Sequence, residues 1–434
     1  MERPFDWLAE QLAGIPQHLA QSDVSPKGVT PAQIHSYLAE HFDLARQAPL
    51  EQVLELTAGM LRDWNVHGRH SAYFGSENGN VHVPGIIAES LAAGWNLQLS
   101  NWQYAPAAVE IERFTLDFLM GRIGLDPKQC VAHFTSSTFE ANHTAVLVAL
   151  TQCFPDFANR GVASCDGQPL FYVSECAQPG FQKISHATGL GRGALRLVPC
   201  DSKGCMEIQT LRRMVIDDAK GGNTPFMIIA TAGTASGGAI DPLKAVAAMG
   251  RVQGMWVHVD AAYGGMGVLC ESLRPHLDGM RFADSVSMSS QHGLSSPIGA
   301  GMFFCRHPRP VQQSFRINSQ DTGDVVYAGL DPHLISLRCS RPALGLKLFL
   351  ALAHLGADGY SDLIQHQLNM TELLRTMLGD HNWRVCNESP LPVLCVQDPG
   401  LSLGVDQLPR YRQWASQIQE SGKAWLEAVR LADG

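Results

Sequence analysis

The chain has 434 residues, which is too long for one simple core and suits two or three packed units. Its 45% hydrophobic and 17% charged residues are ordinary for a soluble globular protein, and a net charge of -9 gives no reason to expect nucleic acid or an anionic membrane as a partner. The apolar runs are far shorter than the roughly 20 residues that a membrane span needs, and the 11 cysteines are scattered without metal-ligand spacing. Composition therefore predicts a cytoplasmic protein without a metal site.

The first 65 residues predict helices, because leucine, valine and phenylalanine recur there at helical intervals. From about 85 to 330 the pattern alternates between amphipathic helices and short apolar strands. Residues 226–230, 255–259 and 302–304 are continuous apolar runs bounded by glycine or polar turns. Such runs are typical of strands that are buried on both faces of a mainly parallel sheet.

Beyond residue 330 the sequence predicts a smaller region. A helical pattern covers 343–355, and apolar strands are expected at 391–396 and 424–431. The last strand reaches a turn before Gly434 with nothing left to pair with, which is an odd end for a domain. We therefore expect this C-terminal region to be incomplete.

Residues 258–265 read His-Val-Asp-Ala-Ala-Tyr-Gly-Gly and follow a buried strand. Asp260 is thus expected at the carboxyl end of that strand, where open α/β sheets bind their ligands. A carboxylate there can keep a pyridinium nitrogen protonated, which makes the ring of pyridoxal 5′-phosphate (PLP) an electron sink. Taken alone, this aspartate could equally cap the next helix. Neighbouring motifs decide between the two interpretations.

Five further segments belong with that motif, in chain order: 71–75 (Ser-Ala-Tyr-Phe-Gly), 96–99 (Asn-Leu-Gln-Leu), 105–113 (Ala-Pro-Ala-Ala-Val-Glu-Ile-Glu-Arg), 172–174 (Tyr-Val-Ser) and 230–234 (Ala-Thr-Ala-Gly-Thr). Together the six resemble the PLP-dependent amino-acid decarboxylases of the glutamate, aromatic-amino-acid and diaminobutyrate type. The resemblance runs from about residue 65 to the end of the chain.

The resemblance implies an α/β architecture, the aspartate aminotransferase-like fold of PLP-dependent transferases, with a mainly parallel seven-stranded sheet. It divides the chain into an N-terminal helical segment (1–65), a large PLP-type domain (66–325) and a small α+β C-terminal domain (326–434). In the family the small domain continues with another strand and helix. The family is an obligate dimer with its site at the subunit interface, so the expected partners are an amino acid or a derivative and a second subunit, either a copy of this chain or an active paralogue.

The chain departs from the family where the cofactor is held. The family has Asp-x-His-Lys-Trp-Leu before the strand at 299–304, and residues 289–294 here read Ser-Ser-Gln-His-Gly-Leu. The Schiff-base lysine position is therefore His292. No lysine lies between Lys244 and Lys347, so no shift of register restores it.

Other positions change with it. The family's ring-stacking histidine falls at Gln178, the phosphate loop at 135–142 reads Thr-Ser-Ser-Thr-Phe-Glu-Ala-Asn with a bulky Phe139, and Gly-Thr-Thr becomes Gly-Thr-Ala at 233–235. Residues 317–324, where the family has a tyrosine that helps to protonate the product, contain none, although Tyr327 lies nearby. The candidates are thus His292 and Gln178 as catalytic residues, with cofactor-binding roles for Asp260, Ala262, Thr135, Ser136, Ser137, Thr138, Thr234 and Gln291.

Imidazole cannot form the stable imine that a lysine amine forms, so the family chemistry is in question here. One hypothesis is a protein of decarboxylase fold without ordinary decarboxylase activity, acting as a pseudoenzyme or as a subunit for an active paralogue. A second is an enzyme that binds PLP or its amine form without a covalent link and uses His292 as a general base. Residual decarboxylation or a different ligand are further alternatives, and His292 could equally be a turn residue that fills the space of the lysine.

Overall fold

The computed structural model describes residues 4–75, 80–316, 331–400 and 407–431. Its backbone divides into two compact units, one formed by residues 1–80 and 404–430 and the other by 81–403 and 431–434. We call them the helical unit and the sheet unit. The three-part division that the family resemblance implies stays a prediction about functional domains.

The helical unit confirms the helices expected in the first 65 residues. Thr30 starts its second helix with a capping box, because its hydroxyl accepts a hydrogen bond from the backbone N–H of Gln33 and the Gln33 side chain accepts one from the backbone of Thr30. The helices of this unit are α1 (Pro4–Gln21), α2 (Pro31–His41), α3 (Leu50–Asp63) and α14 (Leu408–Glu420).

The prediction of a strand at 424–431 is wrong. Only Trp425 forms a β-bridge, with Tyr73, and its backbone N–H donates to the carbonyl of Ala72 at 3.0 Å. The N–H of Phe74 donates back to the carbonyl of Trp425 at 2.9 Å. The alternating apolar pattern correctly marks an extended segment, but a pattern cannot supply a partner strand long enough to extend the ladder.

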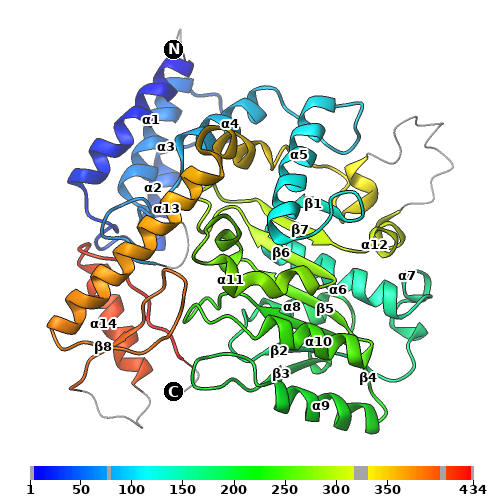
Figure 1. Ribbon diagram of the computed structural model, residues 1–434. Coiled ribbons are helices and arrows are strands. Elements are labelled where there is room, and N and C mark those ends of the chain that lie inside the picture. Colours follow the sequence, from blue (N-terminus) through cyan, green and yellow to red (C-terminus); the bar gives the residue numbers. More distant parts are fainter. Residues whose placement is uncertain (1–3, 76–79, 317–330, 401–406, 432–434) are drawn as a thin grey trace. The chain divides into compact units, whose positions relative to one another are not determined.

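The sheet unit contains the seven-stranded sheet that the sequence predicts (Figure 1). Its strand order is β1-β7-β6-β5-β4-β2-β3; β7 runs antiparallel to both of its neighbours, and the other pairs are parallel. The three apolar runs expected as strands lie in β4, β5 and β7. The strands are β1 (Val131–Thr135), β2 (Pro169–Ser174), β3 (Leu195–Val198), β4 (Thr224–Thr231), β5 (Trp256–Ala261), β6 (Ser285–Ser289) and β7 (Gly301–Cys305).

Helices pack against this sheet and bury β5, β6 and β7 completely. The helix that matters most to the site is α6, which follows β1 directly and contacts β4 to β7. The helices of this unit are α4 (Val83–Gly94), α5 (Pro106–Ile123), α6 (Thr138–Cys153), α7 (Phe157–Arg160), α8 (Gly180–Ala187), α9 (Ile208–Lys220), α10 (Leu243–Gln253), α11 (Arg274–Leu277), α12 (Pro308–Phe315) and α13 (Leu346–Asp380). Among the described helices, none is long and apolar enough to cross a lipid bilayer.

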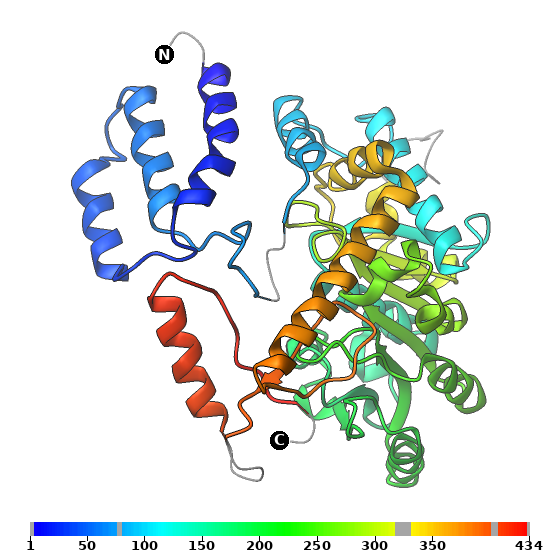
Figure 2. The ribbon, with the colours of Figure 1, turned by 60° about the vertical axis from the view of Figure 1, so that its left-hand side comes forward.

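The region after residue 330 is more helical than the sequence predicts. The helix expected at 343–355 is α13, which begins at Leu346, continues to Asp380 and is kinked at Gly356, where φ is +66° (Figure 2). The strand expected at 391–396 shrinks to β9 (Val396–Gln397), which pairs with β8 (Arg384–Val385). Backbone groups before β9 bond locally instead, as when the Asn387 side chain accepts from the N–H of Cys395 at 2.8 Å.

Gly301 lets β7 approach the loop between β1 and α6. A Cβ atom at this position would lie 2.3 Å from the carbonyl carbon of Ser137 and 2.5 Å from Oγ1 of Thr135. Because backbone atoms cannot move aside cheaply, we expect Gly301→Ala to lower the free energy of unfolding by about 1–3 kcal/mol. Gly121→Ala, at an exposed position of α5 with no heavy atom within 4 Å of the added carbon, is the control and should be stabilising by about 0.5–1 kcal/mol. Urea denaturation of both variants tests this, and equal effects would contradict it.

Candidate cofactor site

Asp260 lies at the carboxyl end of β5, where its side chain is 3% exposed. Its Oδ2 accepts a hydrogen bond from the Asn142 amide at 2.8 Å, and its Oδ1 accepts one from the backbone N–H of Ala262 at 3.0 Å. Burial raises the pKa of the Asp260 carboxyl, and the hydrogen bonds that it accepts oppose that rise. The structure thus places Asp260 as a buried carboxylate at the end of β5, with the backbone of the partly buried Ala262 bonded to it.

A chain of buried hydrogen bonds leads to that carboxylate. Asn142 donates its amide N–H to Asp260, so its amide oxygen is the group that accepts from His258 Nε2 at 2.9 Å. His258 Nδ1 is then the acceptor for the Ser285 hydroxyl at 2.8 Å. The indole N–H of Trp256 donates to Ser285 at 2.9 Å. Every proton in the chain is thus assigned, and the imidazole is neutral.

Burial explains why His258 stays neutral. Removal from water lowers the pKa of its imidazole to about 3, and the backbone of Ser285 opposes this only in part. A protonated ring would also turn Nδ1 into a donor, so the Ser285 hydroxyl, which already accepts from Trp256, could no longer donate to it. His258 and Asn142 therefore position Asp260.

The predicted phosphate loop joins β1 to α6 and is held mainly by its own residues. Ser137 caps the helix, because its hydroxyl accepts from the N–H of Glu140 at 3.3 Å. The N–H and hydroxyl of Ser136 both donate to the Glu140 carboxylate, and the Thr135 hydroxyl donates to the carbonyl of Ser137 at 2.8 Å. The first-turn N–H groups of Thr138 and of the residue after it have no acceptor within the helix, as an anion site at a helix start requires.

Gln178 and Thr234 are occupied by their own turns. The amide oxygen of Gln178 accepts from the backbone N–H of Gly180 at 2.8 Å, and the Phe139 ring lies beside the same glycine. The Thr234 hydroxyl oxygen accepts from the N–H of Ala239 at 3.0 Å. Both residues lie in the loops that follow β2 and β4, and these contacts hold the loops in place.

His292 lies in the turn between β6 and β7. Its ring is 6.0 Å from the Tyr263 ring, and its carbonyl accepts from the N–H of Ser295 at 3.3 Å. A Cβ atom at the next residue, Gly293, would fall 1.6 Å from the sulfur of Met266, so Met266 occupies the space of a side chain there. Burial raises the pKa of the Tyr263 phenol to about 12, which keeps it a neutral neighbour of the imidazole.

The turn that carries His292 meets the phosphate loop. The Gln291 side chain accepts from the N–H of Gly299 at 3.3 Å, and a Cβ atom at Gly299 would lie 3.9 Å from the carbonyl oxygen of Ser136. Lys347 supports the same turn, because its ammonium donates to the carbonyl of Ile298 at 3.0 Å. The structure thus joins Gln291 to the predicted loop at 135–138.

Sequence reasoning missed several supporting residues. Asn142 and Ser287 both contact the Asp260 carboxylate, and buried Lys347 pairs with Glu89 of α4. The first two could have been suspected: Asn142 ends the segment 135–142 that contains the phosphate loop, and Ser287 lies in β6 directly opposite Asp260 of β5. Lys347 gives no such signal, since it is 49 residues away from its carbonyl partner. The segment with Tyr327 lies outside the described residues.

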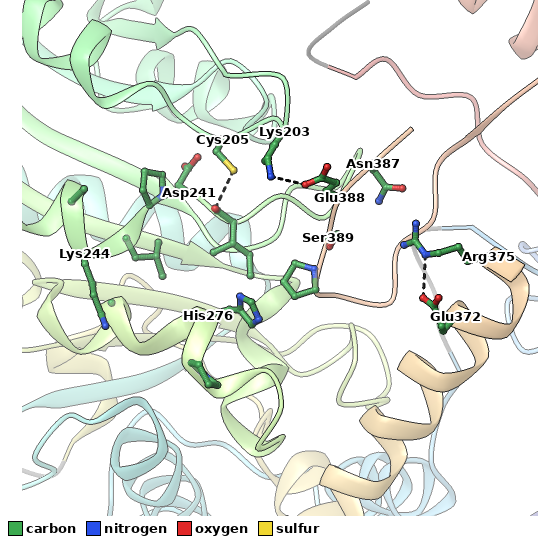
Figure 3. A pocket seen from close by; sticks show the side chains of 17 residues that line it. Lys203, Cys205, Asp241, Lys244, His276, Glu372, Arg375, Asn387, Glu388 and Ser389 are labelled. Atoms are coloured by element: carbon green, nitrogen blue, oxygen red, sulfur yellow. Dashed lines mark hydrogen bonds and ion pairs between the residues drawn. The ribbon is translucent and has the colours of Figure 1, made fainter. Parts of the chain in front are cut away.

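A surface pocket lies apart from these residues. It encloses about 850 Å³ beside the start of α10, and its charged lining includes Lys203, Lys244, Arg375, Glu372 and Glu388 (Figure 3). A second cavity of about 300 Å³ is lined by residues that include Gln98 and His333. Neither contains a predicted site residue.

A model of the pyridoxal-dependent decarboxylase conserved domain matches residues 36–397. The chain belongs to the pyridoxal-dependent decarboxylase family. It is 31% identical to L-2,4-diaminobutyrate decarboxylase of Rhizobium meliloti over 294 residues. The aligned segment covers 67% of this chain and 57% of that relative. To L-aspartate decarboxylase dtxS4 of Metarhizium robertsii it is 25% identical, over 85% of this chain and 74% of the relative.

Solved structures confirm the fold expected from the sequence. Oryza sativa TDC, crystallised with PLP and tryptamine, superposes with a TM-score of 0.90 at 21% identity and covers 99% of this chain and 91% of its own. The apo form of mouse CSAD superposes with a TM-score of 0.89 at 23% identity, and the match covers 98% of this chain and 92% of that chain. At such identities these neighbours show the architecture alone.

The PLP of this decarboxylase family fits this chain at Asp260. A protonated ring nitrogen needs a buried anionic acceptor, and Asp260 Oδ2 accepts a bond from Asn142, which leaves it a second lone pair. A cationic partner would also offset the burial that disfavours the carboxylate. When bound, PLP supplies an electron sink. Asp260 would hold its ring nitrogen, and the start of α6 would face its phosphate.

The neutral His258 makes stability depend on pH. Its folded pKa of about 3 lies below the ordinary 6.5, so the unfolded chain binds the extra proton between these values. Stability from this residue is therefore complete above about pH 6.5 and is lost as the pH falls toward 3. We expect the free energy of unfolding to drop by about 2–3 kcal/mol between pH 7 and 4.5 on this account.

Urea denaturation of the native protein and of His258→Gln at both pH values measures this contribution. Buried carboxyl groups with raised pKa values act in the opposite sense, so the comparison rests on the difference between the two proteins. The variant should show the smaller loss at pH 4.5. An identical pH dependence would mean that His258 is protonated in the folded protein.

Proposed function

We propose that this chain is a decarboxylase homologue with a remodelled cofactor site that lacks ordinary amino-acid decarboxylase activity. The observation that carries the proposal is an imidazole, His292, where the family pattern has its Schiff-base lysine. A lysine amine can exchange its imine for the substrate amine, whereas an imidazole has no primary amine to exchange. The ligand class remains an amino acid or a derivative.

No nearby amine takes over the role in the described part of the turn. Lys347 approaches it, but its ammonium donates to the Ile298 carbonyl and forms an ion pair with Glu89. Both contacts engage the side-chain nitrogen that would have to attack an aldehyde. Lys347 therefore supports the backbone of the turn.

The surroundings of His292 support remodelling around a smaller side chain. Gly293 stands where the family has tryptophan, and Met266 fills the space that a side chain there would need. A tryptophan could not return without displacing Met266. The Gln178 amide, at the ring-stacking position, is held by Gly180, next to the Phe139 ring. These contacts describe a site adapted to its changed residues.

The retained Asp260 favours one second candidate, an enzyme that binds PLP or its amine form without a covalent link. His292 would then act as a general base, since the pKa of imidazole lies near working pH. Tyr263 lies beside the ring as a neutral phenol that can orient it. This candidate predicts cofactor binding without covalent attachment.

The two candidates separate in one experiment. PLP is added to the purified protein, bound cofactor is measured by absorbance, and borohydride reduction followed by mass spectrometry maps covalent attachment. We expect no attachment at position 292 and no carbon dioxide release above background from a panel of amino acids. Reversible binding alone would favour the non-covalent enzyme, and carbon dioxide release with turnover would overturn the proposal.

The variant His292→Lys tests whether the rest of the site can still bind PLP and form a covalent adduct with it. We expect it to form a reducible adduct with PLP at residue 292, because Asp260 and the start of α6 remain in place. His276→Lys, at an exposed position outside the predicted site, is the matched control and should give no specific adduct. Failure of His292→Lys to bind PLP would show that the phosphate loop is also lost.

The proposal includes a cytoplasmic homodimer. Its support is an apolar stripe on α4, where Val83, Ile87 and Leu91 recur every four residues and are 60%, 50% and 45% exposed. Trp95 continues the stripe at 76%. Such a face on a helix is typical of a covered interface. A heterodimer with an active paralogue is the alternative partner.

Light scattering after size-exclusion chromatography tests the dimer. Ile87→Glu places a charge in the stripe and should raise the dimer dissociation constant at least about tenfold, because burying an unpaired carboxylate costs more than 1.4 kcal/mol. Val252→Glu, at an 80% exposed position of α10, is the control. A native protein that is monomeric at micromolar concentration would contradict the homodimer and favour the paralogue.

A further inference from the structure

Two cysteines lie opposite each other just beyond the parallel strands β2 and β3. At the end of this strand pair Ser174 lies opposite Val198. Cys176 comes two residues after Ser174, and Cys200 comes two residues after Val198. The segments stay together there, because the N–H of Glu175 donates to the carbonyl of Val198 at 2.9 Å. Neighbouring strands are about 4.8 Å apart, and segments that keep this spacing place opposite residues within the Cα separations of about 4.4–6.8 Å found in disulfides.

The two cysteines meet at one hydroxyl group. Ser174 Oγ lies 2.9 Å from the sulfur of Cys200, and the same oxygen accepts from the backbone N–H of Cys176 at 3.1 Å. The Cys200 N–H in turn donates to the Glu175 carboxylate at 2.9 Å. Both residues are partly exposed.

The two thiols have opposite tendencies to ionise. A hydrogen bond between them raises the pKa of Cys176 and lowers the pKa of Cys200, and the bond from Ser174 also lowers the latter. Of the two thiols, Cys200 is therefore the one that ionises more readily to the thiolate that attacks a disulfide, and Cys176 is the one that keeps its proton more firmly.

We propose that Cys200 and Cys176 form a thiol pair that small-molecule disulfides oxidise, with Cys200 as the attacking thiol and Cys176 as the resolving thiol. The Cys200 sulfur attacks one sulfur of the small disulfide, breaks its S–S bond and releases one thiolate. Cys176 then attacks the Cys200 sulfur and releases the second. Both cysteine sulfurs are oxidised, the small disulfide is reduced to two thiols, and the two cysteine protons go to them.

A third cysteine nearby is held apart. The Cys205 thiol donates to the carbonyl of Ile240 at 3.3 Å, and this bond points it toward the cavity wall in Figure 3. Burial raises the pKa of Cys205 to about 11, so it stays protonated at neutral pH. A bond between Cys200 and Cys176 is therefore favoured over one with Cys205.

The bond would fasten the candidate site. Cys176 begins the loop that carries Gln178 and leads into α8, and Cys200 follows β3 on the edge of the sheet. A covalent link would tie that loop to the edge strand. Oxidation would thus fix the position of Gln178 whether or not the protein binds a cofactor.

Peptide mapping by mass spectrometry after incubation with glutathione disulfide tests the pair. In the native protein we expect a linked peptide that joins Cys176 to Cys200 and disappears with dithiothreitol. Before oxidation, iodoacetamide should label Cys200 at least about tenfold faster than Cys395, whose pKa burial raises to about 11.

Single substitutions separate the two roles. Cys176→Ser should retain a glutathione adduct on Cys200, because no resolving thiol remains. Cys200→Ser should leave Cys176 without an adduct. Cys339→Ser, which removes an exposed cysteine elsewhere, is the control and should form the linked peptide at the native rate. Free thiols at both positions after oxidation, equal adducts on both single variants, or a link from Cys200 to Cys205 would each overturn the proposal.

Discussion

The site depends on a buried carboxylate that is held by a chain of neutral hydrogen bonds. The Trp256 indole, the Ser285 hydroxyl and the His258 imidazole lie in series behind Asn142, which donates to Asp260. Each group in the series donates a hydrogen bond to the next one and thereby fixes its orientation. Because the members come from β5, β6 and α6, the chain also fixes how the helix packs on the sheet.

This dependence separates what the sequence could predict from what it could not. Continuous apolar runs correctly predicted β4, β5 and β7, because a strand that is buried on both faces needs apolar residues at successive positions. The motif at 258–265 placed Asp260 at the end of β5, because it follows one of these runs directly in the chain. The strand at 424–431 failed because its partner is a distant segment of the helical unit, and local alternation says nothing of how long that partner is. Asn142 belongs to the motif at 135–142, but the motif predicts no role for its side chain, since its contact with Asp260 joins residues 118 positions apart.

The candidate site shows the same limit at the level of single side chains. The family resemblance predicts that positions 292 and 178 depart from the family pattern, but only the structure shows what these two side chains and their neighbours contact. Met266 fills the space beside Gly293, and the Gln178 amide bonds to its own loop. Such compensation depends on packing between segments that no pattern in the chain connects.

The persistence of Asp260 therefore has a reason other than catalysis. Removing any member of the chain behind it would leave a buried donor or acceptor without a partner, which costs about 1–3 kcal/mol for each group. His292 and Gln178 carry no such penalty, since they lie in partly exposed turns. Substitutions are thus expected to be tolerated more readily in these turns than at the buried acid. Folding stability alone would keep Asp260 in place, whatever residues the turns carry.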